Sequence, residues 1–296
     1  MATEASAVGL DRNQRTDEKA VSASVAGRKL PGRSKWRKML ARPPVISALS
    51  VAAVLLIWFA ATSWFQLVPA GRFPTPQEFW SSLRQSLFAG YAGGTLVGHV
   101  WNSLRLVVIG FACAFLTGVP LGLLMGSSRT AEAVINPIFS LMRPIPPLAW
   151  IPLAILWLGL GSAAKVMVIW LAAFVPSVIN SYTGVRGIDK SLIAAARMLG
   201  TPRGRMIGEV IVPGALPLIF TGLRLSLQAA WTTLVAAEMV GALTGVGFVL
   251  NVAQQDIYPS MILVGMLTVG VLGWSTTWAL AVVERRMLAR WPQGRS

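Results

Sequence analysis

The sequence predicts an all-α integral membrane protein with six transmembrane helices, and three observations carry this prediction. Hydrophobic residues make up 54% of the 296 residues and charged residues only 12%, whereas a soluble domain carries about 25% charged residues. The apolar residues fall in blocks of about 20, the length that a hydrocarbon core of roughly 30 Å requires at 1.5 Å per helical residue. The basic residues gather in alternate connecting segments.

The apolar blocks place six helices between two polar ends. Residues 1–44 form a basic tail, residues 45–286 the transmembrane domain and residues 287–296 a second, short tail. Because the first tail is polar and mixes both charges with Ser and Thr, we expect it to be disordered. The predicted spans cover about 46–65, 104–126, 133–157, 163–183, 214–240 and 260–283.

The distribution of Lys and Arg sets the topology. With the N-terminus in the cytoplasm, the cytoplasmic segments hold twenty of these residues and the outer segments only Arg72 and Arg84. Such an excess marks the cytoplasmic side, so both termini are predicted there. The net charge of +15 could also suggest nucleic acid. Nucleic-acid binding is disfavoured because it needs aromatic residues among the basic ones, and the tail offers only Trp36.

The chain itself shows neither an energy source nor a catalytic site. A phosphate-binding P-loop needs a Gly-Lys pair, which the sequence does not contain. The only histidine, His99, has no neighbouring acid to orient it as a base, so an interfacial position explains it better. The only cysteine, Cys113, falls inside a span, which leaves no disulfide framework or metal site. We therefore expect no catalytic residue, no metal and no cofactor bound by this chain.

The longest cytoplasmic segment, residues 184–213, is predicted to fold rather than to act as a linker. Its small and apolar residues recur at helical spacing until Gly200-Thr201-Pro202 breaks the helix. Small residues let a helix approach a partner closely, so the segment suits docking. An amphipathic segment on the inner leaflet, with arginines near anionic lipid, explains the pattern equally well. The apolar positions are Leu192, Ala195, Ala196 and Leu199, then Met206, Ile207 and Val210 in a second short helix.

The same segment resembles the EAA loop of permease subunits in ABC importers. The resemblance rests on Ala194-Ala195-Ala196 with Gly200 four residues later, and on Val210-x-Val212-Pro213 after nine more residues. Ala194 stands where the family carries glutamate, and valine stands where it carries Ile and Leu. The alanine, glycine and proline positions all agree.

Further similarity runs from about Phe73 to Trp291 and narrows the resemblance. Together these motifs are similar to permeases that carry aliphatic sulfonates, taurine, nitrate and related small, mostly anionic solutes. The motifs are Phe73-Pro74-Thr75-Pro76, Ser103-Leu104-Arg105, Gly118-Val119-Pro120-Leu121-Gly122, the proline run from Met142 to Pro152, the segment from Glu238 to Gly247, and Glu284-Arg285-Arg286.

The resemblance implies a type I ABC importer permease that works as a homodimer in the cell membrane of a prokaryote. It also implies two copies of a separate cytoplasmic ATPase, which would bind ATP and Mg, and an extracytoplasmic substrate-binding protein. Closure of the ATPases would rock the two permease halves from inward-open to outward-open, so a coupling residue transmits force and does no chemistry. The implied ATPase-coupling residues are Ala194, Ala195, Ala196, Gly200, Arg203 and Pro213.

Polar and helix-breaking residues in the spans are the candidates for the translocation path. A central arginine costs roughly 2.5–3.5 kcal/mol on insertion scales, and Arg143 precedes a proline run, including Pro146, that must bend the third span. Broken helices form solute sites in many transporters, and a guanidinium can bind an anion in bidentate fashion. A kink with a paired or interfacial arginine is the plainer interpretation. Glu238 ends the fifth span as a gate, an intersubunit ion pair or a cap group facing water.

Other span residues have structural interpretations. Arg105 and Arg224 can pair within the protein or extend to the interface. Gly118, Gly122 and Gly126 recur every four residues and share one helix face, where backbones can approach closely. We favour packing within the chain over a dimer contact for this face.

Two other classes of protein compete with the importer permease. A self-contained secondary transporter or channel needs no ATPase but usually shows titratable midplane residues and often an internal repeat, and no clear repeat relates the two halves of this sequence. A membrane enzyme would need clusters of His, Cys or carboxylates, which the sequence does not suggest.

Overall fold

The computed structural model describes residues 43–64 and 73–289, and the regular structure within these ranges is helical. The chain divides into two units, Met1–Ala60 and Ala61–Ser296, each described by itself. The predicted disordered tail lies outside the described residues except for its last two positions, and so does 290–296 of the second tail.

Unit 1 contributes α3 (Pro43–Phe59), which covers most of the first predicted span and is followed by the π-helical turn η1 (Ala60–Trp64). Two prolines open α3, and proline is tolerated in a first turn because those N–H groups have no intrahelical acceptor. The apolar stretch Leu49–Trp64 is shorter than the about 20 residues of a full span.

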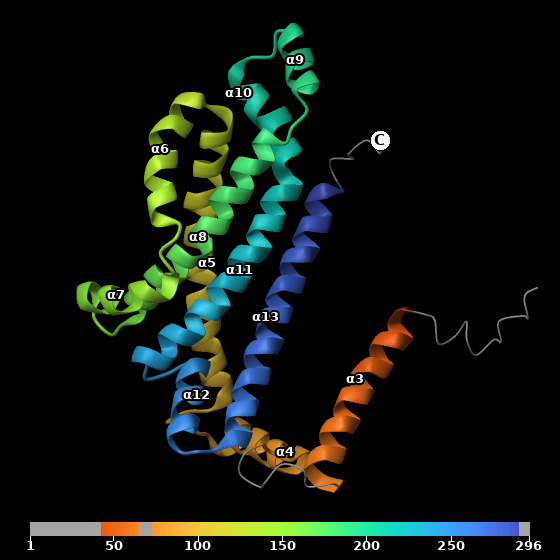
Figure 1. Cartoon of the computed structure of the whole chain (residues 1–296), viewed down its shortest axis with the longest axis vertical. Coiled ribbons are helices and arrows are strands. Elements are labelled where there is room, and N and C mark those ends of the chain that lie inside the picture. Colours follow the sequence, from red (N-terminus) through yellow and green to blue (C-terminus); the bar gives the residue numbers. More distant parts are fainter. Residues whose placement is uncertain (1–42, 65–72, 290–296) are drawn as a thin grey trace, which may run out of the picture. The chain divides into compact units, whose positions relative to one another are not determined.

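Unit 2 contains four helices that are long and apolar enough to cross a membrane (Figure 1). They agree with the second, fourth, fifth and sixth predicted spans. These helices are α5 (Leu96–Ser127), α8 (Ser162–Arg186), the continuous run Met206–Gly241 made of η4 (Met206–Ile211) and α11 (Val212–Gly241), and α13 (Pro259–Leu288).

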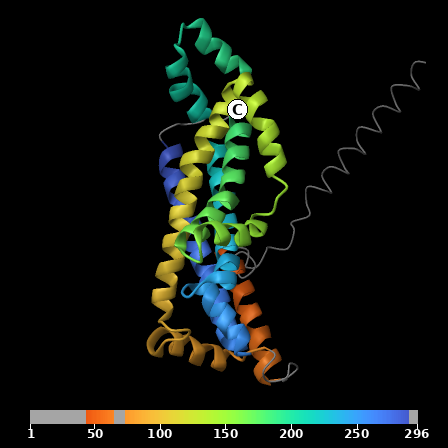
Figure 2. The ribbon, with the colours of Figure 1, turned by 90° about the vertical axis from the view of Figure 1, so that its left-hand side faces the viewer.

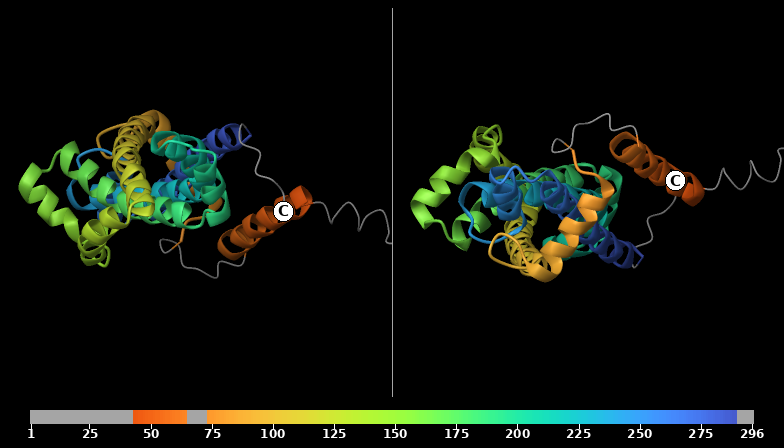
Figure 3. Two further views of the ribbon diagram at one scale, coloured as in Figure 1. Left: turned by 90° about the horizontal axis from the view of Figure 1, so that it is seen from above. Right: turned by 90° about the horizontal axis from the view of Figure 1, so that it is seen from below.

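The third predicted span is bent rather than straight. α6 (Arg129–Met142) is followed by η3 (Pro147–Trp150) and α7 (Ile151–Leu158), and the two parts meet at 81°. The prolines cause the bend because proline lacks a backbone N–H and disfavours helical geometry in the residue before it. Figure 2 shows α6 running back along the bundle, and Figure 3 shows α7 projecting from its side. Where the sequence predicts six spans, the described residues thus supply four, or five with the bent pair.

Short helices occupy the two ends of unit 2 (Figure 1). We call these the α9 end and the α4 end. The α9 end carries α9 (Lys190–Met198) and α10 (Arg203–Arg205), and the α4 end carries α4 (Pro76–Arg84), η2 (Gln85–Ala89) and α12 (Val246–Gln255).

The helices α5, α8 and α11 pack closely because glycines line their contacts. A Cβ on Gly118 would lie 2.9 Å from Ser177 Cβ, and a Cβ on Gly122 would lie 2.5 Å from the Val178 backbone oxygen, both on α8. Gly126 meets α8 in the same way. The predicted glycine face therefore packs within the chain, as expected.

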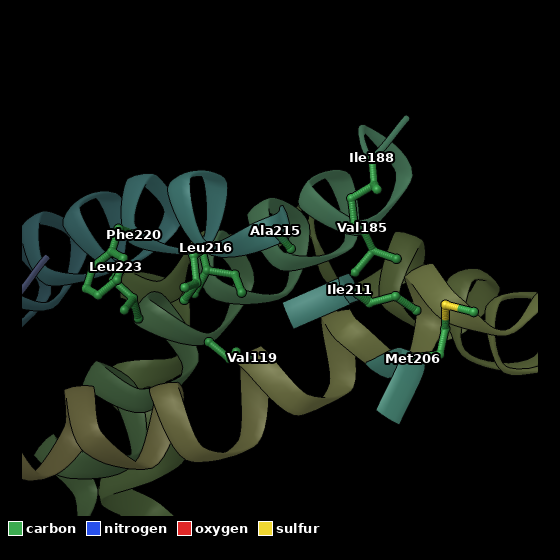
Figure 4. Packing of buried hydrophobic residues seen from close by; sticks show 10 residues of the cluster. Val119, Val185, Ile188, Met206, Ile211, Ala215, Leu216, Phe220 and Leu223 are labelled. Atoms are coloured by element: carbon green, nitrogen blue, oxygen red, sulfur yellow. The ribbon is translucent and has the colours of Figure 1, made fainter. Parts of the chain in front are cut away.

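An apolar cluster fixes the α9 end of the bundle (Figure 4). It joins the last turn of α8 to η4 and to the first turns of α11, so the segment that follows α8 has a rigid base. The buried members are Val119, Val185, Ile188, Met206, Ile211, Ala215, Leu216, Ile219, Phe220 and Leu223.

Helix α13 is attached to α11 by an ion pair. One Arg224 guanidinium nitrogen lies 2.5 Å from both carboxylate oxygens of Glu284. The expectation that Arg224 has a structural partner is confirmed. Arg105 is exposed on α5.

Candidate functional site

The predicted helix–turn–helix within residues 184–213 is present. We call the part from Lys190 to Arg205 the α9 hairpin. Its first helix is capped by Asp189, whose Oδ1 accepts a hydrogen bond from the Ser191 backbone N–H at 2.8 Å. This backbone hydrogen bond, helped by the Ser191 side chain, lowers the pKa of Asp189 because it stabilises the ionised carboxylate.

The turn of the α9 hairpin is a Schellman motif centred on Gly200. The Gly200 N–H donates to the Arg197 oxygen at 3.0 Å, and the Thr201 N–H donates to the Ala196 oxygen at 3.2 Å. Gly200 has a φ of +72°, a backbone conformation that residues other than glycine rarely adopt, and a Cβ there would meet no atom within 4 Å. The position is therefore restricted by backbone conformation and open toward a partner.

Part of the exposed surface of α9 and of its C-cap residue Leu199 is apolar and uncovered within this chain. Met198 and Leu199 are 87% and 86% exposed, and Ala194 and Ala195 are also exposed. Ala196 is half-buried against the apolar cluster of the α9 end. The sequence placed Ala196 and Leu199 on one face, whereas in the structure the first points inward and the second outward.

The second half of the hairpin continues directly into the fifth span. Arg203 opens α10, and Pro213 lies in the first turn of α11. The Val212 N–H donates to the Ile207 oxygen, five residues back. Such π-type bonding fits a position before proline, because the Pro213 ring would crowd the oxygen of the residue four positions earlier.

The bend between α6 and η3 forms one wall of a cavity of about 300 Å³, which we call the Arg143 cavity. Arg143 caps α6 through its N–H, and its exposed side chain has no hydrogen-bonding or ionic partner among the described residues. Pro146, also exposed, is the N-cap residue of η3. The cavity is lined by Phe139, Met142, Arg143, Ile145, Pro147 and Trp150 on one side and by Trp170, Leu171, Ala172, Phe174, Val175 and Pro176 of α8 on the other.

Aromatic rings from the two walls of this cavity contact one another. The rings of Phe139 and Phe174 meet edge to face with centroids 6.4 Å apart, and Trp170 lies 5.4 Å from Phe174. Trp170 is fixed in turn, because its Nε1 donates to Thr117 Oγ1 at 3.0 Å. A cavity with aromatic walls and a guanidinium that no described residue pairs with can bind a small anion by charge and hydrogen bonds while excluding water from its apolar part.

Glu238, the third path candidate, is fully buried near the α4 end. Its Oε1 accepts from Ser103 Oγ at 2.7 Å, and its Oε2 accepts from the Gly247 N–H at 2.8 Å. Ser103 Oγ also accepts from the Val246 N–H at 2.9 Å. The expectation that Glu238 caps its helix while facing water is wrong, because its exposure is 0%.

The turn between α11 and α12 wraps around this carboxylate. A Cβ on Gly245 would lie 2.2 Å from Glu238 Oε1, so only glycine fits there. The Gly245 N–H donates to His99 Nδ1 at 3.1 Å, and His99 Nε2 lies 3.1 Å from the Tyr91 oxygen. His99 Nε2 carries the proton in this arrangement, since a carbonyl can only accept. His99 is 3% exposed, so its ring is buried within the protein. Its expected position at the depth of the outer interface stays a prediction.

A second polar cluster near the α9 end was not predicted. Glu132 Oε1 accepts from the Tyr182 hydroxyl at 2.5 Å, and Oε2 accepts from the Arg186 guanidinium. Glu132 directly precedes the third predicted span and Arg186 follows the fourth by three residues, so both charges were visible in the sequence, but not their pairing.

Within the described ranges no group of three or more His, Cys, Asp or Glu residues could hold a metal ion. The polar groups of Glu238, Glu132 and Arg224 instead join helices to one another.

Comparison with known proteins gives consistent matches. Residues 118–289 match a family model described as binding-protein-dependent transport system inner membrane component. The chain is 35% identical over 256 residues to the taurine transport system permease protein TauC of Escherichia coli (strain K12), covering 86% of this chain and 93% of TauC. It is 35% identical over 265 residues to SsuC of Bacillus subtilis (strain 168), which is named for aliphatic sulfonates transport, covering 89% and 91%.

A solved structure also shares the fold. The chain resembles one in the inward-facing MetNI methionine ABC transporter with a TM-score of 0.58, covering 64% of this chain and 95% of the other. The sequence identity is 21%, so this likeness shows the fold alone.

Proposed function

This chain belongs to the family of binding-protein-dependent transport system inner membrane components and is an ABC importer permease subunit, and on this premise we propose that it carries a small anion, driven by a separate ATPase. The expected solutes are of the sulfonate, taurine or nitrate type. The observation that carries the coupling to an ATPase is the α9 hairpin, a capped helix and a tight turn that leave an apolar surface uncovered.

The α9 hairpin suits an ATPase groove. Its surface residues Met198 and Leu199 are large, apolar and almost fully exposed, and the neighbouring Ala194 and Ala195 allow close approach. The buried cluster beneath the hairpin makes it rigid, so that force applied to it reaches α8 and α11. Burial of such apolar residues stabilises an interface by about 1.5–3 kcal/mol for each large side chain.

The Arg143 cavity suits an anionic solute. Arg143 is a cation without a partner among the residues that the structure describes, and the cavity volume is of the size that a small organic anion fills. Relatives named for taurine and for aliphatic sulfonates support a solute with an anionic sulfonate group. Pro146 contributes by holding the bend open. Glu238 acts on the path indirectly, through the turn that it fixes.

The proposed assembly is a homodimer of this chain with two ATPase copies, which bind ATP and Mg, and an extracytoplasmic substrate-binding protein. The chain crosses the cell membrane of a prokaryote six times, with α3 and the bent pair completing the set and both termini in the cytoplasm. The excess of basic residues in the corresponding segments supports this topology.

Reconstitution tests the proposal. The chain is placed in proteoliposomes alone or together with its copurifying ATPase and binding protein, and the uptake of taurine, ethanesulfonate and nitrate is measured with and without ATP. We expect uptake of at least one anion only with both partners and hydrolysable ATP. Uptake by the chain alone would instead establish a self-contained transporter or channel.

A pair of matched variants tests the docking surface. Leu199→Glu places a charge on the α9 surface, and Ile257→Glu places one on a residue of similar exposure (81%) just after α12, at the α4 end. We expect the ATPase to copurify with the Ile257 variant and not with the Leu199 variant. Equal copurification with both would show that the ATPase binds elsewhere.

A further inference from the structure

We infer that Glu132 is a positioning residue that transmits movement of the α9 hairpin to the wall of the Arg143 cavity. This inference rests on the proposed function and adds the connection between its two sites. It is carried by the contacts of Glu132 with α8 and by the sparse packing of α6.

Glu132 joins the start of α6 to the end of α8. Both of its carboxylate oxygens are engaged, one by the Tyr182 hydroxyl and one by the Arg186 guanidinium. The Arg186 guanidinium carbon also lies 5.6 Å from the centre of the Tyr182 ring, a cation–π distance. A planar guanidinium held by both a carboxylate and a ring has a fixed direction, so we call these three residues the Glu132 clamp.

The α8 side of the clamp is attached to the α9 hairpin. Val185 and Ile188 flank Arg186 and are 5% and 9% exposed in the apolar cluster of the α9 end. Ile193 and Ala196 of α9 pack against the same cluster. A displacement of α9 therefore moves the backbone that carries Arg186.

The α6 side of the clamp leads to the cavity. No residue of α6 is buried, so this helix has little apolar packing to resist a tilt. Two points of attachment to α8 are the clamp, through Glu132, and the ring contact of Phe139 at the cavity. Arg143 follows Glu132 by eleven positions, about 16 Å along a helix, and a tilt of about 10° at the clamp would shift it by about 3 Å. Such a shift is comparable to the diameter of a water molecule and would change the cavity opening.

Transport per ATP separates this role from a merely stabilising ion pair. The complete complex is reconstituted with wild-type chain or with Glu132→Gln, and ATP hydrolysis and anion uptake are measured in the same vesicles. The probe is whichever of taurine, ethanesulfonate and nitrate the wild type takes up best. We expect Glu132→Gln to reduce the anions transported per ATP by about tenfold, because it removes a charge-assisted hydrogen bond, and to change basal hydrolysis by less than about twofold.

Two further variants identify the clamp itself. Tyr182→Phe removes one donor and keeps the ion pair, so we expect a smaller loss of about threefold in transport per ATP. The reversed pair Glu132→Arg with Arg186→Glu restores the attraction with opposite polarity, and we expect it to recover at least about half of the wild-type ratio. A purely local effect of Glu132 would not be rescued by a change at Arg186.

The matched control is Arg129→Gln, which removes an exposed charge from the same turn of α6. Arg129 has no hydrogen-bonding or ionic partner among the described residues. We expect it to keep the wild-type ratio. An unchanged ratio in Glu132→Gln would overturn the inference, and so would a loss that only follows reduced copurification of the ATPase. If the wild-type complex itself shows no ATP-dependent uptake, the proposed function fails instead.

Discussion

Replacing Glu238 by alanine tests the polar network that holds the turn between α11 and α12. The substitution leaves the Ser103 hydroxyl and the Gly247 N–H without their buried acceptor. Each unsatisfied group costs about 1–3 kcal/mol, and the lost side chain leaves a void as well. We therefore expect the free energy of unfolding to fall by about 3–5 kcal/mol. Glu238→Gln keeps one acceptor oxygen, so its expected loss is about 1–2 kcal/mol.

Unfolding in mixed detergent micelles, followed by tryptophan fluorescence, measures these losses. The matched control is Glu209→Ala, which removes an exposed carboxylate from η4 and should change the unfolding free energy by less than about 0.5 kcal/mol. Backbone hydrogen exchange should report the change locally, with the amides of residues 245–247 losing protection first. An unfolding free energy for Glu238→Ala within about 0.5 kcal/mol of wild type would refute the reasoning.

Three further expectations concern transport and packing, and one concerns pH. Gly122→Ala places a Cβ 2.5 Å from a backbone oxygen of α8 and should lower the unfolding free energy by about 1–3 kcal/mol. Gly270→Ala, which adds a Cβ in open space, should not lower it, and equal effects of the two substitutions would contradict the packing argument. Gly200→Trp should abolish ATP-driven uptake while membrane insertion stays normal, and Gly200→Ala should cost only the backbone strain of about 1–2 kcal/mol; normal uptake by the tryptophan variant would refute the coupling role. Arg143→Ala should reduce anion uptake by about tenfold without reducing ATPase copurification, and unchanged uptake kinetics would remove it from the path. The folded-state pKa of Asp189 is lowered, so its stabilising cap is fully present above the ordinary Asp pKa of about 3.9 and is lost as the pH falls through the lowered value. At that pH the backbone amides of α9 should lose protection from hydrogen exchange in the wild type. They should keep it in Asp189→Asn, whose side chain does not titrate.

Local signals in the sequence predicted a large part of the architecture. Proline marks the 81° bend because it cannot continue a hydrogen-bonded helix, and Gly200 marks the hairpin turn because it allows a positive φ. The spacing of Gly118, Gly122 and Gly126 predicted a close contact, which α8 provides. Each of these features depends on residues close together in the chain.

Contacts between distant residues could not be predicted in the same way. Ser103 and Glu238 are 135 positions apart, and Glu132 and Arg186 are 54 apart. In a membrane protein the lipid-facing and buried faces are both apolar, so hydropathy does not show which side a polar residue joins. On α9 both the inward side and part of the uncovered surface are apolar, so its apolar positions did not separate Ala196, which packs inward, from Leu199, which faces outward.

The run from Met206 to Gly241 has 36 residues and no helix end between them. At 1.5 Å per residue a helix of this length measures about 54 Å, more than the thickness of the hydrocarbon core. A push along its axis at the hairpin would therefore have a continuous helical path to the other end of the run, across the π-helical turn η4 and the prolines Pro213 and Pro217. The run ends three residues after Glu238. The glycine turn beyond it therefore lies at the opposite end of the same helical run from the hairpin, where a displacement of that run would be felt.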